Sequence, residues 1–130
     1  MPFSDLQKSV SCLDNKRLGN QIYREAWTLI KGGWPNHPCS KIWANHKHAL
    51  AQYCLYGLDE LNKRGKYYPK WYKIFQDYLN YPDTGPPPIT LIPIFNLSHQ
   101  SNLIKKDPAY YSPIFGNNIP DNLPYVWSIN

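Results

Sequence analysis

The sequence has few cysteines, and their arrangement argues against two classes of small protein. There are three of them, Cys12, Cys39 and Cys54, and no two are separated by two residues. An odd number without a CxxC pair indicates neither a disulfide framework nor a cysteine-based zinc knuckle. We therefore expect no disulfide-dependent fold, and we expect Cys54 to be a small apolar residue inside a helix.

The sequence also lacks a long apolar run. No stretch reaches the roughly 18 apolar residues that a membrane-spanning helix needs. The first ten residues, MPFSDLQKSV, do not join a basic region to an apolar one as a secretory signal does. We expect a soluble, intracellular (cytoplasmic) protein with no membrane partner.

Patterns that hold metals or phosphates are missing as well. His46 and His48 are two residues apart, and side chains at that spacing on a helix point about 200° apart, so they cannot share an ion. His37 and Cys39 have no second ligand pair at zinc spacing. The one glycine pair lacks the Lys-Ser/Thr of a phosphate-binding loop. We expect no metal and no cofactor.

The composition that remains is that of one globular domain spanning residues 1–130, with 42% apolar and 18% charged residues. Fourteen basic residues against nine acidic ones give a formal net charge of +5, which is consistent with a polyanionic partner. Aromatic residues make up 15% of the chain. They could stack on nucleic-acid bases or simply fill a small core, and composition leaves both interpretations open.

Helical periodicity is strongest over residues 14–31. The apolar residues fall at helical spacing and can share one buried face: Leu18, Ile22, Ala26, Leu29 and Ile30. Asp14 is the expected N-cap, and Gly32 with Gly33 should end the helix. The pattern predicts the first of two long helices.

A second long helix is predicted over residues 41–64, with Ser40 as its N-cap and Gly65 at its end. Gly57 lies in its middle, where glycine costs about 0.5–1 kcal/mol relative to alanine, and this suggests a close helix crossing. A third helix is expected over residues 68–79, with Pro69 in its first turn.

The remaining segments should be short or irregular. We expect Ser4 to cap a short N-terminal helix and Ser98 to cap another over residues 99–106, followed by a turn at residues 107–111. Five prolines in residues 80–95 predict a rigid extended loop. Residues 117–130 should form an irregular tail, pinned by Leu123, Tyr125 and Trp127. The expected fold is a single compact all-α domain, a monomer, with two long helices, shorter C-terminal helices and a proline-rich loop.

The polar side of the first long helix carries one carboxylate among several cations. Arg17, Gln21, Arg24 and Glu25 lie on adjoining rows of the helix and could meet one ligand. This arrangement suits acid–base chemistry beside a phosphate backbone. The alternative is a solvated, salt-bridged surface, which is the usual explanation of such charges.

The N-terminus offers a second reactive group. Removal of Met1 would expose the secondary amine of Pro2. A chain-terminal amine has a pKa near about 8, against about 10.4 for lysine, so it is the better nucleophile at neutral pH. The alternative is an ordinary N-terminus without a chemical role.

Several short motifs follow one another along the chain: LDNKRLG at 13–19, YREA at 23–26, GWPNHP at 33–38 followed by Trp43, SHQSNLIKKDP at 98–108 before Tyr110 and Tyr111, and LPYVW at 123–127. Their order and spacing resemble the pyrimidine-dimer DNA glycosylase (endonuclease V-like) family, in a bacterial and phage branch. The resemblance implies an all-α DNA glycosylase and abasic-site lyase that acts without a metal on damaged or modified double-stranded DNA.

The resemblance also implies roles for particular residues. The family's nucleophile is the amine of the mature N-terminus, which matches Pro2, although the characterised enzyme presents a threonine there. The assisting glutamate matches Glu25, and the phosphate-binding arginine before it matches Arg24. A basic side chain earlier on the helix corresponds to Lys16 or Arg17. An aromatic segment near the lesion is similar to residues 108–111 with Phe115 and Gly116.

On this basis the expected site has three parts. The catalytic residues are Pro2 and Glu25, and the base pocket is formed by Trp34, Tyr110 and Tyr111. The expected DNA-phosphate contacts are Lys16, Arg17, Gln21, Arg24, His37, Lys105 and Lys106.

Two other functions fit the same residues. A binding module could hold DNA or a small nucleotide ligand between Arg24, His37, Trp34 and the tyrosines without cleaving it. A protein-interaction domain could use the proline-rich loop of residues 82–93 as a docking surface.

Overall fold

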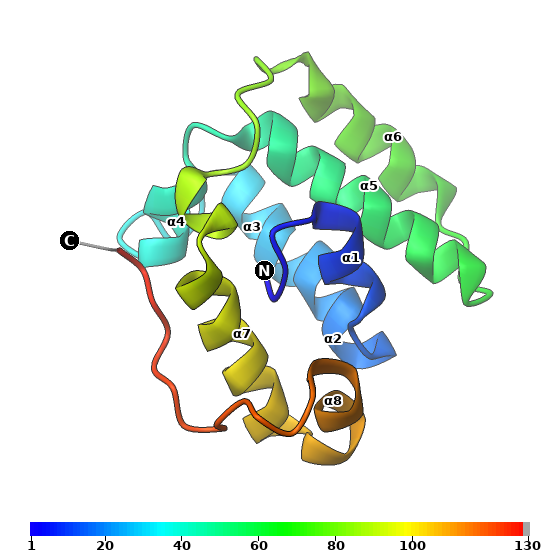
Figure 1. Ribbon diagram of the computed structural model, residues 1–130. Helices are drawn as coiled ribbons and strands as arrows, with labels where there is room; N and C mark the ends of the chain where they lie inside the picture. Colours follow the sequence, from blue (N-terminus) through cyan, green and yellow to red (C-terminus); the bar gives the residue numbers. More distant parts are fainter. Residues whose placement is uncertain (129–130) are drawn as a thin grey trace.

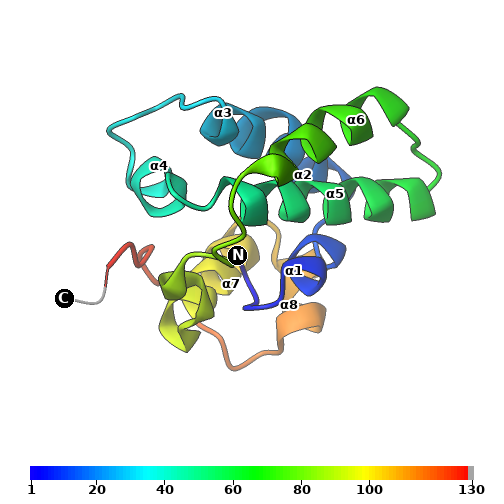
Figure 2. The same ribbon diagram turned by 90° about the horizontal axis from the view of Figure 1, so that it is seen from above.

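The computed structural model describes residues 1–128, and every regular element within them is a helix (Figure 1). The all-α fold is therefore confirmed. No helix in this part of the chain is long and apolar enough to cross a membrane. Figure 2 shows α5 and α6 on one side of the molecule and α7 and α8 on the other. The N-terminus lies near the centre in both views, among these helices.

The first helix, α1 (Leu6–Ser11), begins one residue later than expected. Its N-cap is Asp5 and not Ser4, because the Asp5 carboxylate accepts a hydrogen bond from the Lys8 N–H at 2.7 Å. The prediction that Ser4 caps this helix was wrong.

The first long helix is present, but it consists of three consecutive segments. These are α2 (Asn15–Asn20), a π-helical segment (Gln21–Ala26) and α3 (Trp27–Ile30). Asp14 is at the N-cap position, yet its carboxylate caps no backbone N–H and instead accepts from Tyr111 and Arg17. The helix ends at Gly32, whose φ is +83°, as expected for a glycine stop.

The second long helix was predicted as one element and is in fact two, α4 (Pro38–Trp43) and α5 (Lys47–Lys63). The N-cap of α4 is His37, whose Nδ1 accepts from the Cys39 N–H, and Ser40 lies inside the helix. The helix is interrupted between Trp43 and Lys47, where His46 adopts a non-helical backbone conformation. Its imidazole lies 3.0 Å from the carbonyl oxygen of Gly85.

The close helix crossing inferred from Gly57 is confirmed. A Cβ placed on this glycine of α5 would lie 2.9 Å from Cγ1 of Ile22 in the π-helical segment, and 3.5 Å from Cδ1 of Leu18. Both apolar residues are fully buried. The first long helix and α5 therefore approach so closely that no side chain fits between them at this point.

The later part of the chain is more helical than expected. Pro69 opens α6 (Pro69–Asp77), as predicted, and a 3₁₀ turn (Tyr78–Asn80) follows. The segment predicted as a wholly extended loop contains a second 3₁₀ turn (Pro88–Leu91). It then runs into α7 (Pro93–Lys106). Proline is tolerated at a first helical position because its missing N–H would be unpaired there in any case. Ser98 is consequently buried inside α7 and caps nothing.

The last helix, α8 (Pro108–Phe115), is capped by Asp107, and the chain then follows an irregular course as far as residue 128. This tail runs along α7 (Figure 1). The N–H of Leu123 donates to the hydroxyl of Ser101 at 3.0 Å, and the N–H of Val126 donates to that of Ser98 at 3.3 Å. The expected irregular tail is confirmed over residues 117–128, and residues 129 and 130 lie outside the described part.

Two glycine-to-alanine changes should have opposite effects on stability. Gly57→Ala should lower the free energy of unfolding by about 1–3 kcal/mol, because the new methyl group overpacks the contact with Ile22. Gly19→Ala is the matched control, since Gly19 lies in α2 with nothing within 4 Å of its Cβ position. It should raise stability by about 0.5–1 kcal/mol. Urea unfolding of both variants measures the change in the free energy of unfolding. Equal changes in the two variants would contradict the close crossing.

Candidate active site

A cavity of about 880 Å³ lies between the helix of residues 15–30 and α7, and it gathers many of the residues predicted from the sequence. Residues of the loop before α4 and of the C-terminal tail also form its wall. The predicted site residues that line it are Pro2, Lys16, Arg17, Gln21, Glu25, Trp34, His37 and Lys106. These side chains come from segments far apart in the sequence, so the tertiary fold has brought them together.

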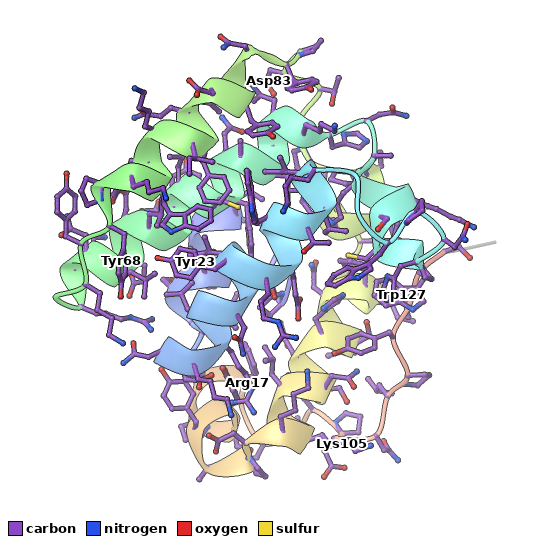
Figure 3. All side chains as sticks on the ribbon, turned by 180° about the vertical axis from the view of Figure 1, so that it is seen from behind. Arg17, Tyr23, Tyr68, Asp83, Lys105 and Trp127 are labelled. Atoms are coloured by element: carbon purple, nitrogen blue, oxygen red, sulfur yellow. The ribbon has the colours of Figure 1, made fainter. Side chains whose placement is uncertain are left out.

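Four predicted site residues do not line the cavity: Arg24, Lys105, Tyr110 and Tyr111. Arg24, Lys105 and Tyr110 are exposed elsewhere on the surface, and Figure 3 shows Lys105 at the C-terminal end of α7. Tyr111 is fully buried, and its hydroxyl donates to the Asp14 carboxylate and accepts from the Asp14 N–H. Tyr111 therefore belongs to the core and offers no face to a base.

The first three residues are held firmly at the cavity. The side-chain amide of Asn96 donates to the carbonyl oxygen of Met1 at 2.9 Å, and that of Gln100 donates to the carbonyl oxygen of Pro2 at 2.7 Å. The hydroxyl of Ser9 both donates to the carbonyl and accepts from the N–H of Phe3. Two side chains of α7 and one of α1 thus fix the path of the N-terminal segment.

This path places the terminal amine inside the protein. Burial lowers the pKa of the Met1 amine from 8.0 to about 5, and the nearby Cys39, Cys12 and Glu25 only partly oppose that shift. At neutral pH the amine is consequently unprotonated, which is the nucleophilic form.

Glu25 lies on the π-helical segment and lines the cavity with an exposed side chain. Neither Glu25 nor Arg24 forms a side-chain hydrogen bond or ion pair with any residue in the described range. The alternative of a salt-bridged surface glutamate therefore does not describe Glu25. Short π-helical segments often occur at functional sites, and nothing in the sequence indicated this one.

The cavity-lining cations differ in how they are held. Arg17 pairs with Asp14 at 3.2 Å, and its guanidinium lies 5.8 Å from the centre of the Tyr111 ring. Figure 3 shows Arg17 near α8. Lys16 and Lys106 are exposed and form no ion pair with other described residues.

Aromatic rings follow one another along the wall of the cavity. Ring centres are 4.5 Å apart for Phe95 and His99, 5.1 Å for His99 and Tyr125, and 5.3 Å for Tyr125 and Trp127. His37 continues the series at 5.8 Å from Trp127, which lies beside the loop before α4 (Figure 3). The sequence predicted Tyr125 and Trp127 only as residues that pin the tail. It did not predict His99 as a site residue, although His99 stands in one of the family motifs.

Trp34 extends this aromatic wall from an unusual backbone conformation. Its φ is +50°, the only positive φ of a non-glycine residue in the described range, and half of its surface is exposed. Bulky residues rarely adopt this conformation, and such outliers concentrate at functional sites. The loop before α4 therefore presents the indole of Trp34 at the cavity.

His99 is unusual among the cavity residues. Its Nε2 atom is buried and has no hydrogen-bond partner among the residues described. Burial lowers the pKa of its imidazole to about 2, so the ring is neutral at any physiological pH. No three His, Cys, Asp or Glu side chains in residues 1–128 lie close enough together to hold a metal ion.

Comparison with known proteins places the sequence in a family. The sequence model of the family described as pyrimidine dimer DNA glycosylase matches residues 1–75, more than half of the chain. This chain belongs to the pyrimidine dimer DNA glycosylase family. The match includes Pro2 and Glu25, whereas α7, α8 and the tail lie beyond it. No curated protein and no solved structure matches the chain. Membership of a bacterial and phage branch stays a prediction.

The buried amine and imidazole should make the protein acid-sensitive. In the chain that retains Met1, the unfolded amine binds a proton below about pH 8 and the folded amine only near pH 5. Its contribution to stability is therefore present above pH 8 and is lost as the pH falls to 5. His99 adds a second loss of stability below about pH 6.5, because its imidazole is protonated in the unfolded chain but not in the folded one.

We expect the free energy of unfolding to fall by roughly 3 kcal/mol or more between pH 8 and pH 5, at about 1.4 kcal/mol per unit of pKa shift. Urea titrations at several pH values between 8 and 5 measure the free energy of unfolding. His99→Phe should remove only the share of the fall that the imidazole adds below pH 6.5, and the share due to the Met1 amine should remain down to pH 5. A stability that is flat from pH 8 to pH 5 would show that the amine is not buried.

Proposed function

We propose that this member of the family is a DNA glycosylase that excises a damaged or modified base, such as a pyrimidine dimer, and then cleaves the strand as an abasic-site lyase. The nucleophile is the secondary amine of Pro2 in a mature chain that begins at that residue. Glu25 is the acid–base group. Double-stranded DNA is the substrate.

The observation that carries this proposal is the anchored N-terminal segment. Asn96 and Gln100 hold the carbonyl groups of Met1 and Pro2. Met1 and Pro2 both line the cavity that Glu25 also lines. Removal of Met1 would vacate space beside the Pro2 nitrogen, where a deoxyribose could enter. Burial at the cavity lowers the pKa of the Met1 amine to about 5, and we expect the same surroundings to favour the unprotonated, nucleophilic form of the Pro2 amine.

The chemistry proceeds in two stages, base excision and strand cleavage, and it ends when water hydrolyses the imine and frees the Pro2 amine. The Pro2 nitrogen forms a bond to C1′ of the deoxyribose as the bond from C1′ to the base breaks, and the proton lost by nitrogen leaves with the base. Opening of the sugar ring then gives an iminium ion, with the ring oxygen taking up a proton. Removal of a proton from C2′ expels the 3′ phosphate and cleaves the strand.

Glu25 suits the proton transfers in both steps. Its carboxylate is not engaged by any described side chain, so it is available to accept the proton from the amine or from C2′. Positioned acid–base groups of this kind contribute about 10²–10⁴-fold to rate.

Exposed cations of the first long helix and of α7 would hold the DNA. Lys16, Lys106 and Arg24 are exposed and lack ion-pair partners among the described residues, so they can contact phosphates without first breaking an internal contact. Such contacts orient the duplex but read no sequence. The target nucleotide must leave the stack to bring C1′ to an amine inside a cavity, and lesions that weaken base pairing lower that cost.

Imine trapping tests the proposal directly. With borohydride present, we expect the protein to form a covalent adduct with duplexes that contain a pyrimidine dimer or an abasic site, because hydride reduces the iminium ion. Mass spectrometry of the protein should show Pro2 as the first residue and the adduct on its nitrogen. Absence of an adduct on every damaged duplex, from protein that begins at Pro2, would reject the amine mechanism and leave a binding protein.

Glu25→Gln should slow base excision by about 10²–10⁴-fold while DNA affinity stays within a few-fold. Glu60→Gln is the matched control, because Glu60 lies on α5, pairs with Arg64 at 3.1 Å and does not line the cavity. Single-turnover excision and DNA binding should be measured for both variants. Equal rates in the two variants would exclude Glu25 as the acid–base group.

Salt dependence separates a DNA substrate from a small nucleotide ligand. Log Kd for duplex DNA should change steeply with log salt, and Lys106→Gln should reduce the magnitude of the slope by about one. Lys73→Gln removes the same charge from α6, away from the cavity, and should leave the slope unchanged. A shallow slope in the unmodified protein would favour the small-ligand alternative.

A further inference from the structure

The peptide bond between Met1 and Pro2 lies where the proposed chemistry would take place. In the chain that retains Met1, the carbonyl carbon of that residue is bonded to the Pro2 nitrogen. In the covalent intermediate of the proposed function, the same nitrogen is bonded to C1′ of the deoxyribose. The surroundings of the Met1 carbonyl group therefore indicate which side chains would surround C1′.

The peptide group and the intermediate correspond atom by atom. The carbon–nitrogen bond is a partial double bond in the peptide and a full one in the iminium ion, so both groups are planar. The Met1 carbonyl carbon stands for C1′, the carbonyl oxygen for the ring oxygen O4′, and the Met1 Cα for C2′. Met1 and Pro2 both line the cavity, so a sugar inside it could take this position once Met1 is removed.

One side chain of α7 donates to the oxygen that stands for O4′. The amide nitrogen Nδ2 of Asn96 donates to the carbonyl oxygens of Met1 and Thr90, both at 2.9 Å. Carbonyl oxygens only accept, so Nδ2 and not Oδ1 of the amide must face them. Asn96 is 8% exposed and Thr90 is fully buried. Packing as well as hydrogen bonding therefore fixes the orientation of the Asn96 amide.

Removal of Met1 would leave half of this amide without a partner. The bond to Thr90 remains and holds the side chain, whereas the other N–H of Asn96 then points to the space that Met1 vacates. A buried donor without an acceptor destabilises a protein, and a ligand oxygen at that point restores the bond. By the correspondence above, the oxygen that the reaction brings there is O4′.

We propose that Asn96 is a catalytic hydrogen-bond donor to O4′ while the sugar ring opens. This assignment rests on the proposed glycosylase and lyase function. During ring opening, the lone pair of the Pro2 nitrogen forms the second bond to C1′ and the bond from C1′ to O4′ breaks. O4′ keeps that electron pair and takes up a proton from solvent. The Asn96 N–H stabilises the negative charge that grows on O4′ and keeps its own proton.

The two stages of the reaction make opposite demands on this hydrogen bond. When the base departs, C1′ becomes positive and O4′ shares its electrons with it, as in glycoside hydrolysis, so a donor to O4′ gives no help. When the ring opens, O4′ gains electrons and the donor becomes effective. Asn96 should therefore affect strand cleavage far more than base excision, whereas a residue with a merely structural role would affect both alike.

The test measures the two stages separately in single turnovers of a dimer-containing duplex, with protein that begins at Pro2. Hot alkali cuts every strand whose glycosidic bond is broken, and without alkali only the strands cut by the protein are counted. Asn96→Leu keeps the approximate size of the side chain and removes its N–H groups. We expect base excision to stay within about threefold and strand cleavage to slow by about 10²-fold, the usual cost of losing one such donor. The borohydride adduct should form as slowly as the strand is cut.

Asn102→Leu is the matched control. Asn102 is another amide of α7 that donates to two carbonyl oxygens, those of Ser98 at 2.8 Å and Leu123 at 3.1 Å, and it does not line the cavity. The ratio of its two rates should equal that of the unmodified protein.

A second comparison identifies an effect of loosening the nucleophile. Gln100→Leu removes the bond to the Pro2 carbonyl and leaves Asn96 in place, so it should slow both stages by the same factor. Thermal unfolding verifies that each variant is folded, and Asn96→Ala replaces Asn96→Leu if the leucine variant does not fold.

Equal slowing of both stages in a folded Asn96 variant would overturn the assignment, because Asn96 would then only support the structure. Strand cleavage at the unmodified rate would overturn it as well. Failure of the proposed function looks different, since the unmodified protein that begins at Pro2 would then form no borohydride adduct. That result would reject the role of Asn96 together with the amine mechanism.

Discussion

The site depends on the way in which the chain's first residues are fastened to α7. Asn96 and Gln100 hold consecutive backbone carbonyls of Met1 and Pro2, and so a segment that in most proteins lies at the surface enters the interior. The terminal amine is shielded from water as a result, and shielding disfavours its protonated form. Burial of this segment thus sets both the position and the protonation state of the Met1 amine. Other residues of the same helix, Phe95, His99, Leu103 and Lys106, line the cavity, so α7 both anchors the N-terminal segment and forms part of the site.

The first long helix gives the opposite wall, and its geometry is set by packing. Gly57 lets α5 approach Ile22 in the π-helical segment more closely than any side chain would allow. The π-helical segment that packs there carries Glu25 on its other side, toward the cavity. One short stretch of helix therefore both packs against α5 and directs the Glu25 carboxylate toward the cavity. The tail completes the enclosure, because the hydroxyls of Ser98 and Ser101 hold its backbone along α7.

Local signals predicted much of the fold. Glycine at positive φ ends the helices at Gly32 and Gly65, Pro69 opens α6, and the period of the apolar residues located the first long helix. These features depend on neighbours within a few residues, which is why they could be inferred without coordinates. Errors arose where a distant contact overrode a local preference. His46, which contacts the carbonyl oxygen of Gly85, interrupts the second long helix. The error at Pro93 is different, because a local rule explains it: proline is tolerated at the first position of a helix.

The sequence by itself determined the fold class, the helix stops and the motif that places Glu25 in a family of DNA glycosylases. It also predicted Pro2 and Glu25 as the catalytic residues, and these two roles stay predictions. Only the tertiary structure decided which side chains share a cavity, because residues of the N-terminus, α7 and the tail meet through contacts nearly one hundred positions apart, as in the bond from Gln100 to Pro2. It moved Tyr111 into the core and brought His99 to the cavity wall. Burial and electrostatic environment depend on such long-range contacts, and no local pattern encodes them.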